Sequence, residues 1–250
     1  SQKMDGTVIV DVPMLSNGEL NYGLSHIKKK LYEENVYPSE IGFDIMSLAT
    51  MVYMADTRIE RVVHGQDSWT REIELEIPVS NVEIWDSQIR TVERMLKFLT
   101  GDLWKITLSS RAWQFNNLEE VREKSNKYDE VSLFSGGMDS LISTINLMEN
   151  KKNTLLISHA GEGLTKNAQK NIVNKFDLLY PDVLHTWLDL WMVFPRDYIP
   201  AGGNDNNTRS RSFLFIGYAL FAMTGMDNIN ELLVPENGLI ALNVPLDETR

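Results

Sequence analysis

The segment Ser135-Gly136-Gly137-Met138-Asp139-Ser140 combines residue types that can hold a phosphate group and a divalent ion. Its adjacent glycines allow a tight turn in which the backbone approaches a ligand closely, and the amides that open a following helix point at an anion that the helix dipole also favours. Ser135 and Ser140 add hydroxyl donors, and the carboxylate of Asp139 can hold a divalent ion beside the phosphates. These residues therefore predict a phosphate-binding loop.

Two other loop chemistries are excluded by the residues found here. A Walker A loop needs a lysine after its second glycine, and none follows Gly137, so transfer of a γ-phosphoryl group is not supported. The Gly-x-Ser-x-Gly elbow of serine hydrolases is also absent. The alternative without chemistry is a glycine-rich turn in which a Ser or Asp side chain caps a helix.

Two arginines follow a polar loop further along the chain. Arg209 and Arg211 come after residues 201–208, which are rich in glycine and asparagine. Arginine binds a phosphate or a carboxylate through two parallel hydrogen bonds, so an arginine between a loop and a helix suits an anionic ligand. An ordinary surface arginine at a helix start is the alternative for each. The solvated face of another helix is expected to carry Lys166, Lys170 and Lys175.

Hydrophobic patterning predicts alternating strands and helices around the loop. Strands are expected at residues 131–134, 154–158, 183–187 and 231–234, and helices at residues 139–149, 167–179 and 212–224. Alternation at this interval is typical of right-handed βαβ units around a parallel sheet. Ligands bind where the strands of such a sheet end, so Ser158 and His159 are expected to share one crevice with the loop.

Residues 1–127 are interpreted as a smaller, accessory α+β domain. The strands expected at residues 7–12 and 73–79 look antiparallel, and the second alternates apolar residues with glutamates, as a strand with one solvated face does. Residues 44–56 are apolar on several sides. Nothing in this half has the spacing of a catalytic or metal-binding motif.

One helix and one linker complete this half. Residues 88–100 have helical spacing, with Asp86 or Ser87 as the expected cap and Gly101 as the expected end. Residues 117–127 are rich in charge and are the candidate linker between domains. The aromatic side chains expected in the core or at an interface are Trp69, Trp85, Trp104 and Trp113.

The composition excludes several classes of protein. The chain has 250 residues and a formal net charge of −11 at pH 7, so it lacks the basic surface that nucleic-acid binding requires. It contains no cysteine, which excludes disulfides, thiolate zinc sites and a cysteine nucleophile, and makes the cytoplasm the expected compartment. No apolar stretch is long enough to predict a membrane-spanning helix or a signal peptide.

The loop resembles the pyrophosphate loop of the N-type ATP pyrophosphatases, which include the asparagine, GMP and NAD synthetases. Within that group, the chain from about Asp129 to Asn243 resembles the 7-cyano-7-deazaguanine synthase (QueC) family. The other motifs that carry this resemblance are Ser158-His159-Ala160-Gly161, Arg209-Ser210-Arg211-Ser212-Phe213 and Pro235-Glu236-Asn237-Gly238.

The complete layout is similar to the longer QueC-like proteins of bacterial anti-phage operons, the QatC group of the Qat defence system. This narrower resemblance is carried by Asp44, Tyr53-Met54-Ala55-Asp56, Trp69-Thr70-Arg71 and Phe98-Leu99-Thr100-Gly101-Asp102-Leu103-Trp104. It implies an α/β fold, with a parallel-sheet, adenine-nucleotide α-hydrolase-like (PP-loop) domain at residues 128–250. It also implies a partner protein of the defence operon, bound through residues 1–127.

The resemblance further implies an ATP-dependent ligase that works with magnesium. ATP would be cleaved between its α- and β-phosphates, a carboxylate would be activated as its adenylate, and pyrophosphate would be released. The implied substrate is 7-carboxy-7-deazaguanine or a close analogue, and the nucleophile is ammonia or an amine of a partner protein. Two alternatives stay open: a catalytically silent nucleotide-binding subunit, and amidation of another small carboxylic acid.

Individual residues receive roles from the same resemblance. ATP and pyrophosphate would be bound by Ser135, Gly136, Gly137, Met138, Asp139, Ser140, Ser158 and His159. The substrate would be bound by Arg209, Arg211, Glu236 and Asn237. Asp139 would hold the magnesium ion, and Asp139 and Arg211 would be the catalytic residues. For His159, a histidine satisfied at a strand end is the alternative.

The chain departs from the family in its metal. Members of the QueC family carry zinc-binding cysteines close to the C-terminus, and these 250 residues contain none. Either the chain is truncated after Arg250, which is the expectation we favour, or this branch lacks the zinc. Zinc would then bind only if a missing C-terminal segment supplied the cysteines.

Overall fold

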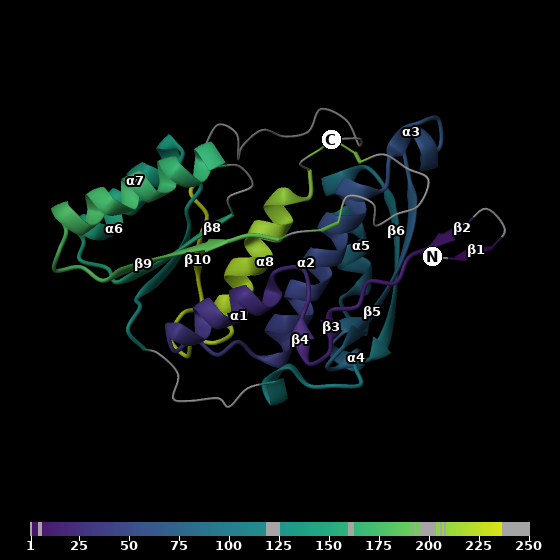
Figure 1. The fold of residues 1–250 in the computed structure, drawn as a ribbon, viewed down its shortest axis with the longest axis horizontal. Coiled ribbons are helices and arrows are strands. Elements are labelled where there is room, and N and C mark those ends of the chain that lie inside the picture. The colour runs from purple at the N-terminus through teal and green to yellow at the C-terminus, as the bar shows by residue number, and fades with distance from the viewer. Residues whose placement is uncertain are drawn as a thin grey trace.

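The computed structural model describes most of the chain (Figure 1). The described residues are 2–4, 7–118, 126–159, 163–192, 194–195, 204–205, 207 and 209–236. Outside them lie most of the linker expected at 117–127, Ala160 and Gly161, most of the loop at 201–208, Asn237 and the C-terminal end of the chain. Across the described residues, no helix is long and apolar enough to cross a membrane.

A four-stranded parallel sheet organises the second half of the chain. Its strands are β7 (Glu130–Leu133), β8 (Thr154–His159), β9 (His185–Leu190) and β10 (Leu232–Leu233). They stand in the order β10-β7-β8-β9, and each neighbouring pair is parallel. The expected parallel sheet of an α/β protein is confirmed, although the third strand begins and ends later than the expected 183–187.

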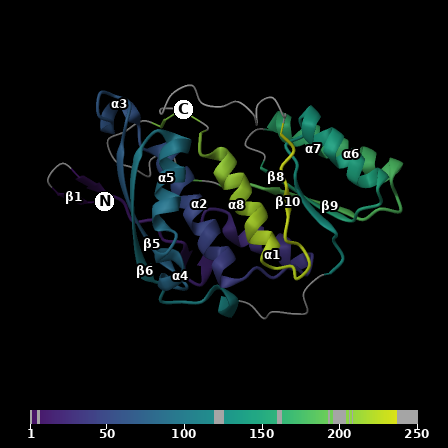
Figure 2. The same ribbon diagram turned by 180° about the vertical axis from the view of Figure 1, so that it is seen from behind.

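Helices cover both faces of this sheet (Figures 1 and 2). They are α6 (Met138–Glu149) and α7 (Gly163–Leu179) on one face and α8 (Arg211–Met223) on the other. Phe134 and Leu156 pack with Phe176 of α7, whereas Leu155 and Ile157 belong to the larger hydrophobic cluster that includes α8. Successive strand residues point to opposite faces, so a sheet covered on both sides needs such continuous apolar strands.

The strand order reverses at β7. From β7 the chain moves outward to β8 and β9, and it then returns through α8 to place β10 on the other side of β7. In open α/β sheets, ligands bind outside the carboxyl ends of the two strands that flank such a reversal. The topology therefore favours the ends of β7 and β10 as a binding region.

The first half contains short antiparallel pairs and one parallel pair of strands. Its strands are β1 (Gln2–Met4), β2 (Thr7–Ile9), β3 (Leu15–Ser16), β4 (Glu19–Leu20), β5 (Glu72–Val79) and β6 (Leu103–Ser110). Its helices are α1 (Leu24–Glu33), α2 (Glu40–Arg58), α3 (Arg61–His64), α4 (Val82–Asp86) and α5 (Ile89–Thr100), with a 3-10 turn, η1, at Phe115–Leu118. The antiparallel pairs are β1 with β2 and β3 with β4.

The long strands β5 and β6 are parallel, which corrects the antiparallel expectation. They pair along all of β5, and α4 and α5 form the crossover that a parallel pair requires. The expected alternation in β5 is confirmed, since Glu72, Glu74 and Glu76 are exposed while Ile73 and Ile77 are buried. The alternation of apolar and charged residues shows which face of a strand is exposed to solvent. It does not show whether the neighbouring strand is parallel or antiparallel.

The ends of α5 agree with the sequence at one terminus only. Gly101 ends the helix in the left-handed conformation, with φ 77°, as expected. The expected cap at Asp86 or Ser87 is wrong, because Gln88 precedes the helix and no side chain caps it. Asp86 instead ends α4, and the hydroxyl of Ser87 donates to the Ile84 carbonyl at 2.8 Å.

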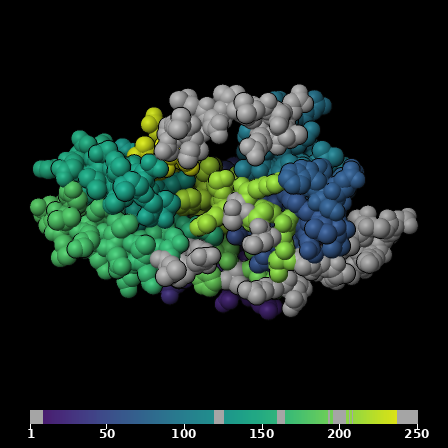
Figure 3. Space-filling view, turned by 90° about the horizontal axis from the view of Figure 1, so that it is seen from above, coloured from purple at the N-terminus to yellow at the C-terminus, as the bar shows by residue number. Residues whose placement is uncertain are grey.

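Helix α2 of the first half packs antiparallel along α8 of the second. Gly42 lies against Thr224, and seven residues later Ala49 lies against Gly217. A Cβ on Gly217 would come within 2.7 Å of the Ala49 Cβ, so glycine is needed where the helices approach this closely. In Figure 3 the yellow-green atoms of the segment around α8 lie between the teal and green atoms of α6 and α7 and the blue atoms of the first half.

The two halves share one hydrophobic core. The same buried cluster contains Phe43 of α2, Trp85 and Trp104 of the β5–β6 unit, Leu133 of β7 and Phe221 of α8. The core position expected for these two tryptophans is thus confirmed. The division of the chain at residue 127 stays a prediction, and the two segments that it separates are packed against each other.

Candidate functional site

The segment 135–140 forms a closed loop between β7 and α6. The amide of Gly136 donates to the Ser140 hydroxyl at 3.1 Å, and the amide of Gly137 donates to the Ser135 hydroxyl at 3.2 Å. The two hydroxyl oxygens are 3.1 Å apart. Gly136 has φ 80°, and a Cβ there would lie 2.8 Å from Cγ of Gln169, so both conformation and space require glycine.

Gln169 of α7 holds the back of the loop and was missed by the sequence analysis. Its side chain is fully buried, and Nε2 donates to the Ser135 carbonyl at 3.0 Å and to the Phe134 carbonyl at 3.4 Å. Its Oε1 is buried and has no hydrogen-bond partner among the described residues. The sequence did contain a signal that Gln169 would be buried, because its spacing places it on the same helical face as the apolar Ile172, Val173 and Phe176.

The start of α6 is open toward solvent. Gly137 precedes the helix in an extended conformation and has no side chain to cap it, while Ser135 and Ser140 accept the amides of the turn itself, so the alternative of a turn held by serine side chains stays open. Met138 and Asp139 are exposed in the first turn, whereas Ser140 is buried. An exposed carboxylate beside an uncapped helix start is accessible to a cation and to the anion that the cation accompanies.

The end of β10 lies beside the end of β7. Leu233 pairs with Ser132, so Glu236 and Ser135 each follow that pair by three residues. Glu236 is exposed, and its neighbour Asn237 lies outside the described residues. The register therefore places Glu236 at the carboxyl-terminal end of the parallel strands, where the loop also lies.

Ser158 and His159 end β8 and point to opposite faces of the sheet. The Ser158 hydroxyl accepts a hydrogen bond from Nε1 of Trp187 at 2.6 Å on the face covered by α7. The His159 ring lies between Tyr218, at 5.8 Å and stacked, and Tyr53 of α2, at 6.0 Å and edge-on. Tyr53 of the first half thus packs against His159, a contact that was not predicted from the sequence.

His159 is held neutral. Burial, together with the positive charge of Arg211, lowers the pKa of His159 to about 4. Its Nδ1 is buried and has no hydrogen-bond partner among the described residues. No described residue satisfies this nitrogen, and the role of His159 as a ligand contact stays a prediction.

The lowered pKa of His159 predicts a loss of stability in acid. The unfolded chain binds a proton at His159 near pH 6.5 and the folded chain only near pH 4, so the free energy of unfolding falls as pH drops through this window. Between neutral pH and about pH 4.5 the loss from this one group is about 2–3 kcal/mol. Denaturant titration at both pH values should show that His159→Phe loses less stability than the wild type by this amount. The exposed His26 gives the matched control, and equal acid losses in wild type and His159→Phe would contradict the assignment.

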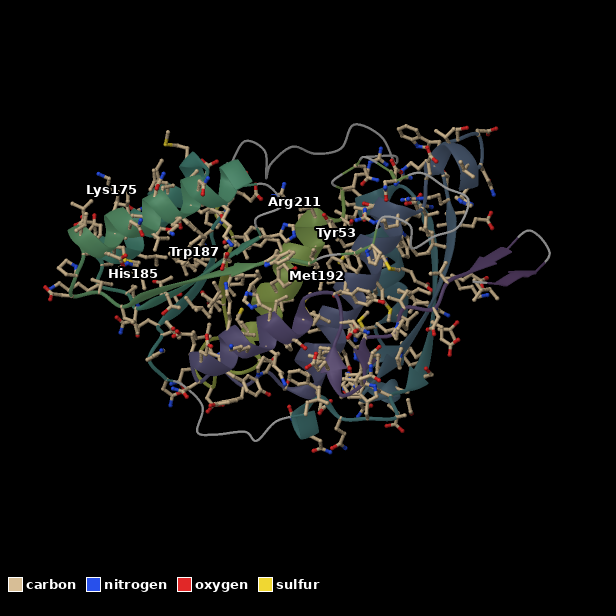
Figure 4. The ribbon with its side chains drawn as sticks, in the orientation of Figure 1. Tyr53, Lys175, His185, Trp187, Met192 and Arg211 are labelled. Carbon is tan, nitrogen blue, oxygen red and sulfur yellow. The ribbon has the colours of Figure 1, made fainter. Side chains whose placement is uncertain are left out.

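The two predicted arginines point to different places. Arg211 is the first residue of α8, is exposed, and donates from Nη2 to the His159 carbonyl at 3.3 Å, at the carboxyl end of β8. Figure 4 shows Arg211 and Tyr53 near the same end of α8. Arg209 turns toward the first half, donates to the Thr100 carbonyl at 2.7 Å and lies over the exposed ring of Trp69, 5.2 Å from its centre.

Asp189 is a further charged residue near the carboxyl ends of the parallel strands, and it was not predicted from the sequence. Asp189 of β9 pairs with Ser158 in register and forms ion pairs with Lys166 of α7 and Lys30 of α1. Burial raises the pKa of Asp189, but the two lysines outweigh it and hold that pKa below its ordinary value. The solvated interpretation of Lys166 is therefore incomplete. Lys166, Lys170 and Lys175 are all exposed as expected, and Lys175 is labelled in Figure 4.

The exposed carboxylate of Asp139 is the candidate metal ligand at the loop. Among the described residues, no group of three or more His, Asp or Glu side chains can hold a metal ion. Magnesium is commonly held by one or two carboxylates together with the phosphates of a substrate. The exposed Asp139 beside the loop hydroxyls fits that pattern.

Comparison with known proteins identifies no relative of this chain. A scan against protein-family models, a search of curated proteins and a search of solved structures each found no match to the chain.

Proposed function

We propose that this protein activates a carboxylic acid with ATP, forming an acyl adenylate and releasing pyrophosphate. One observation carries the proposal: the loop Ser135–Ser140 leaves β7 where the strand order of a parallel sheet reverses and leads directly into an uncapped helix. Phosphate groups bind at helix starts in this position because backbone amides and the helix dipole both favour negative charge.

The loop contacts supply donors that a phosphate can take over. The amides of Gly136 and Gly137 now donate to the hydroxyls of Ser140 and Ser135. A phosphate oxygen is charged and accepts a hydrogen bond more strongly than a hydroxyl does. On binding, the amides and hydroxyls would turn to the pyrophosphate part of ATP and stabilise the charge that grows on it as it leaves.

Asp139 and Arg211 act from the two sides of this region. The Asp139 carboxylate would hold a magnesium ion, which neutralises phosphate charge when bound. Arg211 would bind the α-phosphate or the carboxylate of the substrate, because its exposed guanidinium stands at the carboxyl end of β8, next to β7. Holding the two reactants together in this way lowers the entropic part of the barrier.

The substrate in the proposal comes from the resemblance to the QueC family. It is a 7-deazaguanine carboxylate, and the adenylate would react with ammonia or with an amine of a partner protein in a bacterial anti-phage defence system. Activation of the acid is chemically required in either case, since a free carboxylate is a poor electrophile, and adenylation supplies AMP as a good leaving group.

Exchange of labelled pyrophosphate into ATP tests the activation step without any nucleophile. We expect the full chain to catalyse exchange with magnesium and 7-carboxy-7-deazaguanine, and not without the acid. Exchange with aspartate instead would identify amidation of another small acid. Binding of ATP and magnesium without exchange for any acid would identify a silent nucleotide-binding subunit, and absence of ATP binding would refute the proposal.

A further inference from the structure

A buried cluster of charged side chains joins the first half of the chain to the start of α8. Its members come from α2, α3, the residues directly before β5 and β6, and the segment before α8: Asp56, Arg61, Arg71, Asp102 and Asp205. Asp56 and Asp102 are fully buried, and Arg71 is 1% exposed. Three carboxylates, of Asp56, Asp102 and Asp205, pair with the two guanidinium groups of Arg61 and Arg71.

Two arginines bridge the same two aspartates. Arg71 Nη2 lies 2.7 Å from Asp56 Oδ1 and 2.6 Å from Asp102 Oδ2. Arg61 reaches Asp102 Oδ1 at 2.6 Å and Asp56 Oδ1 at 3.2 Å. Burial disfavours the charged form of Asp102, but its bonds with Arg71 and Arg61 outweigh this and keep the pKa of Asp102 below its ordinary value. The geometry is thus a closed network of fork-shaped donors and paired acceptors.

The outer side of this network binds the segment that leads into α8. The Ser210 amide donates to Asp56 Oδ2 at 3.1 Å, directly before the first residue of the helix. Asn207 donates to the Asp56 carbonyl at 2.9 Å. Arg209 donates to the Thr100 carbonyl, which also accepts from Arg61 at 3.1 Å. The bonds of Asn207, Arg209 and Ser210 thus hold three residues that lie within four positions of Arg211.

We infer that the buried cluster is a positioning device, in which residues of the first half fix the start of α8 and thereby aim Arg211 at the proposed ATP site. This inference rests on the proposed function. A buried ion network is weak evidence for stability, because the cost of removing charges from water offsets much of their attraction. Its useful property is a unique geometry, here imposed on the residue that precedes Arg211.

The chain contains a matched control at the other end of α2. Asp44 is fully buried like Asp56, lies on the same helix, and accepts from Ser80 at 2.6 Å and Trp85 at 3.1 Å, with Arg111 2.9 Å away. Its contacts lie far from α8 in sequence and within the first half. Asp44→Asn therefore removes a comparable buried charge without touching the segment before Arg211.

The test compares Asp56→Asn with Asp44→Asn in the full chain, using acid-dependent pyrophosphate exchange with ATP and magnesium. We expect Asp56→Asn to lower the exchange rate at least tenfold and Asp44→Asn to lower it less than threefold. Combined with Arg211→Ala, Asp56→Asn should cost less than a further twofold, since a misplaced arginine and an absent one are equivalent. Equal losses from Asp56→Asn and Asp44→Asn, or fully multiplicative losses in the double variant, would overturn the inference.

Hydrogen exchange at the start of α8 keeps the test independent of catalysis. We expect the amides of Ser210 and Leu214, which are bonded to Asp56 and to the Ser210 carbonyl, to lose protection at least tenfold in Asp56→Asn and to keep it in Asp44→Asn, even if the wild type catalyses no exchange of pyrophosphate. Unchanged protection in Asp56→Asn would refute the positioning role while leaving the proposed function standing. If Asp56→Asn does not fold, Arg61→Lys replaces it, because it keeps the charge and loses the fork, and the same two outcomes apply.

Discussion

Asp139→Ala is expected to abolish magnesium-dependent turnover of ATP while leaving the fold intact. The carboxylate is exposed in the first turn of α6, so its loss costs about 1 kcal/mol of stability or less. Its loss from the proposed site removes the protein ligand for magnesium, and removal of one such electrostatic contact lowers a rate by about 100-fold or more. Pyrophosphate exchange and thermal unfolding of the same sample measure the two effects.

The control for Asp139 is the exposed carboxylate of Asp182, which lies between α7 and β9 at the opposite end of the parallel strands. Asp182→Ala should exchange pyrophosphate at the wild-type rate. The magnesium dependence supplies a second readout, because Asp139→Ala should no longer respond to added magnesium. Wild-type turnover in Asp139→Ala would remove Asp139 from the site.

Arg211→Lys is expected to be impaired almost as severely as Arg211→Ala. Lysine keeps the positive charge but loses the planar fork that binds two oxygens at once. Loss of such a charge-assisted pair corresponds to about 10–100-fold in rate. Steady-state exchange rates for both variants give the comparison, with Lys170→Ala as the control for an exposed cation elsewhere on the second half.

The ordering of the two Arg211 variants separates two physical roles. A bidentate contact predicts that both variants are slow. A long-range effect of positive charge predicts a lysine variant close to wild type and a slow alanine variant. Near-normal rates in both would make Arg211 an ordinary surface arginine, and its bond to the His159 carbonyl would then be structural only.

Local patterns in the sequence determined the elements that carry the candidate site. Apolar runs predicted the strands of the parallel sheet, and helical spacing predicted α6, α7 and α8 to within a few residues. Gly101 ends α5 as predicted, because a left-handed conformation at a helix end favours glycine. The position of the loop 135–140 between a strand and a helix followed from the same patterns, since each depends on residues only a few positions apart.

The tertiary structure alone decided which distant residues meet. Nothing in the alternation of β5 specified a parallel neighbour, and nothing near Arg71 indicated that it would be buried between Asp56 and Asp102. Nor did the sequence indicate that Arg209 would bond to the Thr100 carbonyl of the first half and Arg211, two residues later, to the His159 carbonyl of the second. Such contacts depend on how α2 packs along α8 and on where buried charges find partners, and these are properties of the assembled core rather than of any local segment.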